Sequence, residues 1–388
     1  MSRSEVVARG LRALLVTAVC GAAGLSSAAT AQAATPVAIT CGAVLHQDAY
    51  LGADLTCPEG NGITVDADIS IDLQGHYLKG PGDGGTVGVT VIYPASLKIT
   101  HGRLTGWLTG LALVNPYPPP TQPKAQSTTI IAVTFLSNGS GVNTGATHIP
   151  GAPVPRMTIW RSWFVDNTFG LGGGGGDTSV TVAGGAFEKN DVRIFESAFG
   201  ASNRLSLSNT ALTDNDVGLI CRSAVCDVSS NTFTANPVAV QTDSQDTLLT
   251  LTGNTMTGST QEAVNIVNTA NAVVTGNNVS RSAVGITLVN SSGNIANNVL
   301  SANGRGVQLL VPADRSQFPL ARVTGNRISG SVVDGIRLDG GSGAAIGENT
   351  VINNGSYGIY APGAVDAGGN HASGNGLTPQ CVGVVCRP

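Results

Sequence analysis

One short phrase recurs through the second half of this chain and constrains its fold more than any other feature. The phrase is an asparagine, any residue and an apolar residue, followed after a few polar residues by glycine, apolar, any, apolar. Examples are Asn277-Asn-Val with Gly285-Ile-Thr-Leu, and Asn326-Arg-Ile with Gly335-Ile-Arg-Leu. The phrases lie about 22 residues apart, a period that marks a stacked repeat architecture. Their leading asparagines are Asn209, Asn231, Asn254, Asn277, Asn297, Asn326, Asn349 and Asn370.

A repeat of about 22 residues has room for three short strands and three turns. One such coil cannot bury its apolar face alone, so neighbouring coils must stack around a continuous core. We therefore expect an all-β, single-stranded parallel β-helix (a solenoid) of about ten coils. Charged residues make up only 11% of the chain and 52 of 388 residues are glycine, which suits short strands and tight turns.

A second polar series follows an apolar position that Phe135, Phe164, Phe187 and Ala211 fill in the early repeats. Identical asparagines in stacked strands can hydrogen-bond along the column. We therefore interpret both series as ladder and turn residues and not as catalytic ones. The members of the second series are Asn138, Asn167, Asn190, Asp214, Asn236, Asn354 and Asn375.

The first 34 residues have the features of a cleaved secretory signal peptide. Arg3, Arg9 and Arg12 precede an apolar stretch at 13–25, and small residues surround position 33. We expect a secreted, extracellular protein without a membrane span after cleavage; an uncleaved N-terminal anchor is the alternative. The formal net charge of −4 offers no basic patch, so no nucleic-acid partner is expected.

Six cysteines remain after cleavage, in three close pairs. In an exported chain such pairs indicate local disulfides, and the spacings do not suit zinc. The pairs are Cys41–Cys57, Cys221–Cys226 and Cys381–Cys386. The resulting organisation is an N-terminal cap with the first strands at 35–82, repeats at 83–376 and a C-terminal cap at 377–388.

Long interruptions follow the same strand of the coil in four repeats. Loops that leave one corner in this way can wall a groove beside that strand. The alternative is that they are solvated insertions without a partner. The interruptions are residues 115–127, 144–156, 172–176 and 311–320.

The repeated phrases resemble those of the right-handed parallel β-helices of the pectate-lyase-like superfamily, over roughly residues 60–376. Asp72-Leu-Gln-Gly-His near the start and Gly369-Asn-His near the end resemble a group of secreted β-helix proteins of unassigned function. The resemblance implies right-handed coils. It leaves the activity open, because the superfamily includes polysaccharide lyases, polygalacturonases, epimerases and non-enzymatic surface proteins.

No catalytic motif of that superfamily is complete in this sequence. The pectate-lyase motif Arg-x-Pro-x-x-Arg is echoed around Pro319 and Arg322, but Gln317 replaces its first arginine. The motifs of polygalacturonases and alginate epimerases are absent. The glycine run before Asp177 matches a calcium-binding nonapeptide only in part, so we expect no cofactor and no metal ligands, with calcium left open.

Candidate site residues follow from strand geometry. In glycine, apolar, any, apolar, the apolar residues point inward and the residue between them points outward. We expect Arg337 and Asp339 as the catalytic pair, with Arg337 as the base of a β-elimination. Substrate-binding residues would be Gln308, Tyr360, Asn265, Thr287 and Asn143. The alternative is an ordinary solvated sheet face.

Two tryptophans lie close together beside the early insertions. Trp160 and Trp163 flank Arg161 and Ser162. Because side chains alternate along a strand, residues three apart point to opposite faces unless a turn intervenes. We expect one of the two to be available to a sugar ring and the other to cover the core.

These features predict a protein that binds or processes extracellular polysaccharide or cell-wall glycan in a groove along one sheet. If it is an enzyme, a polysaccharide lyase or a related carbohydrate-active enzyme is expected. The alternative is a non-catalytic structural or adhesive protein of the cell wall or surface.

The signal-peptide interpretation gives a first testable prediction. When the full chain is expressed in a secreting host, the exported protein should begin at Ala34 or Thr35. N-terminal sequencing or intact-mass measurement checks this. An exported form that still carries Arg3, Arg9 and Arg12 would show that the segment is retained as an anchor.

Overall fold

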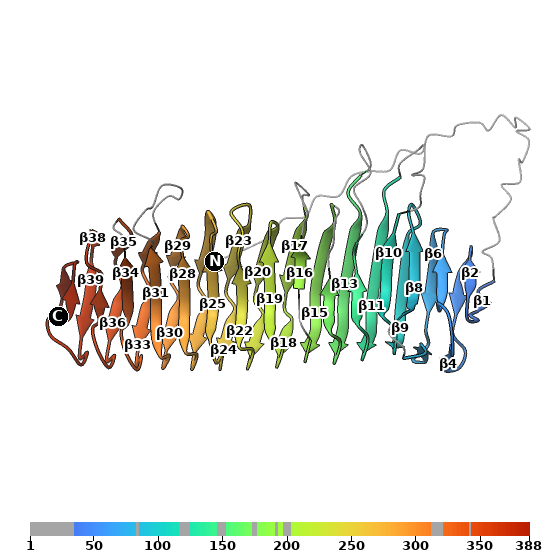
Figure 1. Cartoon of the computed structure of the whole chain (residues 1–388), viewed down its shortest axis with the longest axis horizontal. Coiled ribbons are helices and arrows are strands. Elements are labelled where there is room, and N and C mark those ends of the chain that lie inside the picture. Colours follow the sequence, from blue (N-terminus) through green and yellow to red (C-terminus); the bar gives the residue numbers. More distant parts are fainter. Residues whose placement is uncertain are drawn as a thin grey trace, which may run out of the picture. The chain divides into compact units, whose positions relative to one another are not determined.

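The computed structural model describes residues 35–82, 85–115, 124–145, 153–172, 177–190, 193–196, 203–311, 321–340 and 343–388. In these ranges the chain is a parallel β-solenoid of about 13 turns without any helix, which confirms the expected fold with a few more coils than the ten predicted. Figure 1 shows the strands following one another along the stack in chain order. No helix within the described ranges could cross a membrane.

Two smaller sheets take one strand from each coil. β14 lies beside β16, so the first of them continues into the second. The six-stranded sheet consists of β2 (Ala43–Leu45), β5 (Ile63–Val65), β8 (Val87–Ile92), β10 (Thr109–Val114), β12 (Ser140–Asn143) and β14 (Phe169–Gly172). The nine-stranded sheet consists of β16 (Arg193–Glu196), β19 (Val217–Arg222), β22 (Val238–Thr242), β25 (Glu262–Val267), β28 (Val284–Val289), β31 (Arg305–Val311), β34 (Ile336–Gly340), β37 (Ile359–Tyr360) and β40 (Cys381–Val382).

The remaining 26 described strands form one sheet, here called the bent sheet, to which most coils contribute two arms. In the early coils both arms belong to one long strand: β9 (Leu97–Thr105), β11 (Ser127–Leu136), β13 (Arg156–Val165) and β15 (Ser179–Glu188). The others are β1 (Val37–Ala38), β3 (Ala49–Tyr50), β4 (Leu55–Thr56), β6 (Ile69–Asp72), β7 (Tyr77–Lys79), β17 (Arg204–Ser208), β18 (Ala211–Thr213), β20 (Val225–Ser229), β21 (Thr232–Thr234), β23 (Leu248–Thr252), β24 (Thr255–Thr257), β26 (Asn271–Thr275), β27 (Asn278–Ser280), β29 (Gly293–Ala296), β30 (Val299–Ser301), β32 (Arg322–Thr324), β33 (Arg327–Ser329), β35 (Ala345–Gly347), β36 (Thr350–Ile352), β38 (Val365–Gly368), β39 (Asn370–Ser373) and β41 (Cys386–Arg387).

The coil β23–β24–β25 shows why the phrase has its form. Gly253 adopts a φ of 65° and turns the chain between the two arms, and the next residue, Asn254, points its side chain inward. A second residue with positive φ, Gly258, precedes the buried Ser259 before β25 begins. A left-handed residue followed by a buried polar residue therefore makes each of these two bends.

The buried asparagines form hydrogen-bonded ladders along the stack, as predicted. The Asn254 Nδ2 donates to the Val228 carbonyl at 3.0 Å and to Asn277 Oδ1 at 3.0 Å. Its own Oδ1 accepts from the backbone N–H of Asn231 at 2.9 Å and from the Asn231 Nδ2 at 3.0 Å. A side chain that is 1% exposed thus has its polar groups paired, which is the condition for burying an amide.

Three assignments to the ladders are wrong by one position. Asn209, Asn297 and Asp214 have φ values of 51°, 54° and 53° and are the left-handed bend residues. The ladder positions belong to the residues that follow them, namely Thr210, Asn298 and Asn215. The reason is that asparagine and aspartate tolerate a positive φ better than other non-glycine residues, so they suit either position.

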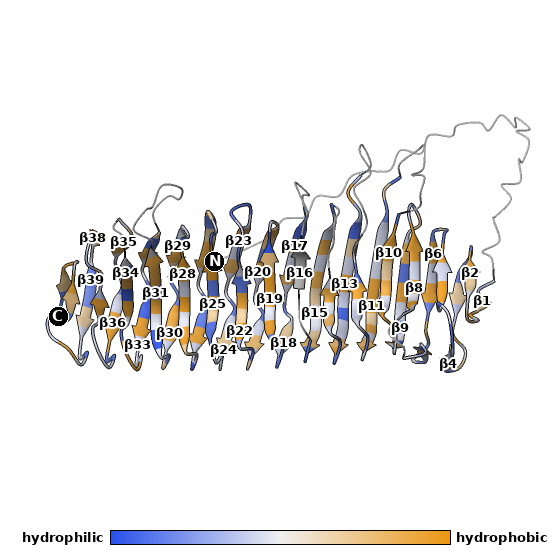
Figure 2. Cartoon of the chain, viewed as in Figure 1, coloured by the Kyte–Doolittle hydropathy of each residue, from blue (hydrophilic) through white to orange (hydrophobic). Residues whose placement is uncertain are grey.

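Apolar side chains fill the interior in matching columns. The rings of Phe135 and Phe164 stack with centroids 4.9 Å apart, and those of Phe164 and Phe187 with centroids 4.4 Å apart. Leu212 continues this column, and not Ala211 as predicted, because Leu212 is the residue in register with Phe187. Figure 2 shows the alternation of hydrophobic and hydrophilic residues along the strands.

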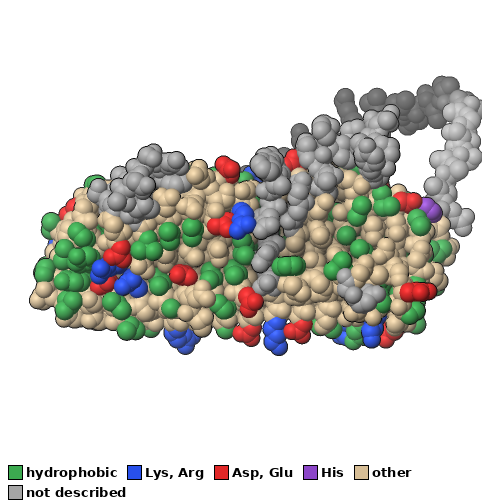
Figure 3. Space-filling view, viewed as in Figure 1, with side chains coloured by type: hydrophobic (Ala, Val, Ile, Leu, Met, Phe, Trp, Pro, Cys, Tyr) green, Lys and Arg blue, Asp and Glu red, His purple; other side chains and the backbone are tan. Residues whose placement is uncertain are grey.

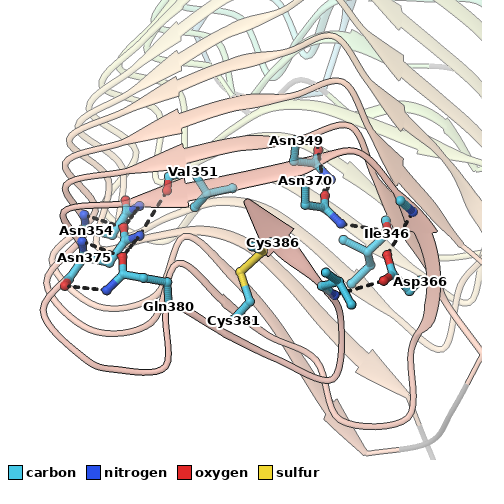
Figure 4. The surroundings of a disulfide bond; sticks show 12 residues. Ile346, Asn349, Val351, Asn354, Asp366, Asn370, Asn375, Gln380, Cys381 and Cys386 are labelled. Carbon is cyan, nitrogen blue, oxygen red and sulfur yellow. Dashed lines mark hydrogen bonds between the residues drawn. A yellow bond between two sulfur atoms is a disulfide. The ribbon is translucent and has the colours of Figure 1, made fainter. Parts of the chain in front are cut away.

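All three predicted disulfides are present, with Cα–Cα distances of 5.6 Å for Cys41–Cys57, 6.5 Å for Cys221–Cys226 and 6.1 Å for Cys381–Cys386. The last joins β40 of the nine-stranded sheet to β41 of the bent sheet, and so ties the two sheets together at the C-terminal coil (Figure 4).

The ladders end in different ways at this coil. Gln380 closes the second ladder, since its Oε1 accepts from the backbone N–H and the Nδ2 of Asn375 at 2.9 and 2.7 Å. Figure 4 shows Asn349 and Asn370 ending the first ladder beside Ile346. The predicted signal peptide and its cleavage site lie outside the described residues.

Two adjacent asparagines test the ladder. Asn277 is 1% exposed and bonds to both neighbouring coils, whereas Asn278 is exposed. We expect Asn277→Ala to lower the free energy of unfolding by about 3 kcal/mol, because it leaves buried groups on two coils unpaired. Asn278→Ala should change it by less than about 0.5 kcal/mol. Calorimetric melting of both variants checks this, and equal effects would contradict the role given to the ladder.

Candidate functional site

The outward series predicted from the sequence forms a continuous column on the nine-stranded sheet. Strand pairing places Asn265 beside Thr287, Thr287 beside Gln308, Gln308 beside Arg337, and Arg337 beside Tyr360. We call this column, together with Asp339, the polar strip. Its members come from β25, β28, β31, β34 and β37, whose inward neighbours are buried.

Asn143 is not part of the strip. It lies on β12 in the six-stranded sheet, between Ala112 and Gly172. Its Oδ1 accepts a hydrogen bond from the Gly145 N–H at 2.8 Å, which is a local turn contact. The structure therefore separates Asn143 from the other predicted binding residues.

Arg337 is the centre of a network of charged side chains at the C-terminal end of the strip. Its Nε donates to Asp339 Oδ1 at 2.6 Å, and its Nη1 lies 3.3 Å from Asp334 Oδ2. Gln308 donates to the other oxygen of Asp339 at 3.2 Å. The predicted residues Gln308, Arg337 and Asp339 are thus in direct contact.

Three further members of the network do not follow from the outward pattern. The Asp334 side chain is fully buried, and its Oδ1 accepts from the Tyr357 N–H at 3.2 Å. The Arg305 Nε lies 3.7 Å from Asp334 Oδ2. Asp334 and Tyr357 occupy the turns that lead into β34 and β37, so only the fold brings them to the strip.

Aromatic rings complete this end of the strip. The Arg337 guanidinium carbon lies 4.4 Å from the centroid of the Tyr360 ring, a cation–π contact. The ring of Tyr357 lies 5.2 Å from that of Tyr360 at a tilt of 41°. One arginine is therefore held by two carboxylates and by the face of an aromatic ring.

The pKa of Arg337 is raised, chiefly by its hydrogen bond to Asp339; burial opposes this as the second-largest effect, and the charges of Asp339 and Asp334 add to the rise. A general base must release its proton near the working pH. The role of Arg337 as base stays a prediction, and this raised pKa argues against it.

The other end of the strip carries buried polar atoms without partners. Thr287 is 3% exposed, and its Oγ1 has no hydrogen-bond partner in the described ranges. The Oδ1 of Asn265, the neighbour of Thr287 in the strip, is likewise buried and unpaired there. Buried polar groups are nearly always hydrogen-bonded, but these two oxygens are covered by the surrounding side chains and do not face a ligand.

The four insertions predicted to wall a groove fall mainly outside the described residues. The strands that precede them are β10, β12, β14 and β31, each in the six- or nine-stranded sheet. The groove itself stays a prediction. A cleft of about 300 Å³ lined by Asp68 and Lys98, and one of about 290 Å³ lined by Lys189 and Asp214, include no strip residue.

Neither a metal-ligand cluster nor the incomplete pectate-lyase motif adds a residue to the strip. Within the described ranges, no three His, Cys, Asp or Glu side chains are placed to hold a metal ion. Arg322, from the incomplete pectate-lyase motif, begins β32 in the bent sheet and not in the sheet that carries the strip.

The prediction that one of two tryptophans covers the core is wrong. Trp160 and Trp163 are 50% and 43% exposed. Arg161 between them has a φ of 47°, so the strand bends there and both indoles face outward. The left-handed bend is the intervening turn that strand alternation alone does not reveal.

Residues 217–377 match the family model of a right-handed β-helix region, which confirms the predicted repeat type and fits the pectate-lyase-like superfamily. Two solved structures are similar at low scores. The A-module of mannuronan C-5 epimerase AlgE6 from Azotobacter vinelandii shares 14% identity, with 88% of this chain and 91% of that chain covered and a TM-score of 0.33. A mutant of the periplasmic alginate epimerase AlgG shares 12% identity, with 85% of this chain and 76% of that chain covered and a TM-score of 0.34. We base no argument on scores this low. No curated protein matches the sequence.

The network makes a prediction about Arg337. The Nε–H of Arg337 should exchange slowly with solvent, because it donates to Asp339 at 2.6 Å, and Asp339→Asn should speed that exchange by about tenfold. Asp216→Asn, at an exposed position in the turn before β19, is the control and should leave the exchange rate unchanged. Nitrogen-detected NMR of the arginine side chains makes the measurement. Equal exchange in all three proteins would mean that Asp339 does not hold Arg337.

Proposed function

We propose that this right-handed β-helix protein is exported and binds an extracellular polysaccharide, without cleaving it, along the polar strip of the nine-stranded sheet. The observation that carries the proposal is the fixed contact set around Arg337. Two carboxylates and the Tyr360 ring hold the guanidinium, so its remaining N–H groups have defined directions. Preorganised donors bind a ligand at a smaller entropic cost than mobile ones.

The strip offers the groups that sugar hydroxyls require. Arg337 and Gln308 supply donors, Asp339 supplies acceptors, and the Tyr360 ring supplies an apolar face near them. Side chains in register on neighbouring strands suit an extended polymer lying along the stack, because successive strands are about 4.8 Å apart.

The same contacts favour binding over catalysis. Proton abstraction needs a group that can lose its proton, and the pKa of Arg337 is raised. Asp339 and Asp334 both form ion pairs with that arginine, so both carboxylates already have partners in the resting protein. The incomplete catalytic motifs of the sequence agree with a non-catalytic role.

Export is supported by covalent chemistry. Three disulfides form between all six cysteines of residues 35–388, and such bonds persist in oxidising compartments. Together with the features of the first 34 residues, they support a secreted protein whose partner is a polysaccharide outside the cell or in its wall.

The test is a glycan array followed by calorimetric titration of any glycan that binds. We expect Arg337→Ala combined with Tyr360→Ala to weaken binding by about tenfold or more, because both central contacts are lost. Arg327→Ala removes an exposed arginine from β33 in the bent sheet and should leave affinity unchanged.

If the double variant still binds the glycan with unchanged affinity, the strip is not the binding site. Assays for unsaturated products and for new reducing ends, on the glycans that bind, test the non-catalytic part of the proposal, since product formation would contradict it. A protein that binds no glycan would instead be a structural rod of the cell surface.

A further inference from the structure

The exposed tryptophans form a second surface, on the bent sheet. We define the tryptophan corner as Trp160, Arg161 and Trp163, at the bend of β13. Burying a large apolar side chain lowers the free energy, and tryptophan has among the largest areas to bury. The third tryptophan of the chain, Trp107, is 2% exposed and donates its Nε1–H to the Leu78 carbonyl at 3.0 Å. Two half-exposed indoles at one bend therefore require an explanation.

The corner is held rigidly by the coil before it. Ser162 is 2% exposed, and its hydroxyl donates to the Trp160 carbonyl at 3.1 Å. The same oxygen accepts from the Val133 N–H of β11 at 3.3 Å. A buried serine thus fixes the backbone between the two indoles, which reduces the entropy that a ligand would have to remove.

The following coil leaves space beside both rings. In β15 the residues at the bend are Ala183, Gly184, Gly185 and Ala186, with Ala183 in register with Trp160 and Ala186 with Trp163. A Cβ at Gly185 would lie 1.9 Å from the Ser162 carbonyl oxygen, so only glycine allows this close approach. Small side chains on one side make a ledge next to the indoles.

The surroundings of the corner are cationic. In β9, β11, β13 and β15 the cations are Lys98, Arg103, Arg156 and Arg161, all exposed, against Glu188 at the end of β15 and the exposed Asp166 directly after β13. The Arg161 guanidinium carbon lies 6.0 Å from the Trp160 ring centroid. This local excess of positive charge contrasts with the net charge of −4 for the chain. Figure 3 shows how sparsely charged groups cover the face seen there.

We propose that the tryptophan corner binds an anionic polysaccharide, with the C–H faces of its pyranose rings packed on Trp160 and Trp163 and a uronate carboxylate paired with Arg161. The site is independent of the polar strip, since it lies on a different sheet and has a different charge. A nucleic acid also offers flat rings and negative charge, so single-stranded DNA is included in the test as the competing occupant.

The test uses tryptophan fluorescence of the full exported protein. Oligogalacturonate is the probe, and cello-oligosaccharide is its neutral counterpart. Oligogalacturonate should change the emission saturably, because the rings that it covers move out of water. The double variant Trp160→Ala with Trp163→Ala should abolish that change while Trp107 still emits. Arg161→Gln should weaken binding of oligogalacturonate by about tenfold, as expected for losing a charged contact at a hot spot.

Two controls separate this site from the strip and from loss of folding. Val273→Ala removes a 40% exposed side chain elsewhere on the bent sheet and should bind as the wild type does. The Arg337→Ala, Tyr360→Ala variant should keep the fluorescence response, so failure of the strip and failure of the corner are distinguishable. Melting temperatures within a few degrees of the wild type confirm that each variant is folded.

Several outcomes would overturn the proposal. They are an unchanged emission with oligogalacturonate, a response that persists in the double tryptophan variant, and equal affinity for the neutral oligosaccharide. Tighter binding of single-stranded DNA would assign the corner to nucleic acid. An emission that depends on protein concentration without any ligand would assign it to contact between two copies of the chain.

Discussion

The solenoid depends on the pairing of buried backbone N–H groups at its bends. Strands in neighbouring coils satisfy one another, but a bend interrupts the ladder of main-chain bonds just where the chain turns around the core. Asparagine resolves this, because its side-chain oxygen accepts the N–H of the coil before it while its amide nitrogen bonds the coil on either side. Serine or threonine takes the position in some coils, with fewer bonds. Registers, sheets and the outward columns all follow from this alignment.

The repeat period and its apolar positions were enough to predict the fold and the outward column from Asn265 to Tyr360, and the close spacing of the cysteines was enough to predict the three disulfides. The bends were harder to predict, because each contains two adjacent positions that both favour asparagine, one for its left-handed backbone and one for its side chain. Asn297 and Asn298 illustrate the problem, since only the second bonds along the ladder. A single sequence gives no measure of φ at such a pair.

The site was predictable where strand alternation decides which way a side chain points. Gln308, Arg337 and Asp339 meet as expected, because all three lie within paired strands. Asp334 and Tyr357 join them from turns, whose spacing varies between coils. The outward orientation of both Trp160 and Trp163 depends on a left-handed arginine, a conformation that the residue type does not suggest. Functional side chains that lie at bends are therefore the ones that the sequence pattern does not predict.

Because the coils are uniform, the distance between two sites along the axis depends on the number of coils between them. The strands β14, β16, β19, β22, β25, β28, β31 and β34 follow one another, so seven steps separate the coil of Trp160 from that of Arg337. At about 4.8 Å per step, the two surfaces are roughly 34 Å apart along the axis. Removing residues 254–276 would join Gly253 to Asn277, the same pair of residue types as before, and shorten that distance by one step without breaking a ladder. The spacing between sites is thus set by the number of coils, in fixed increments, and can evolve separately from the sites.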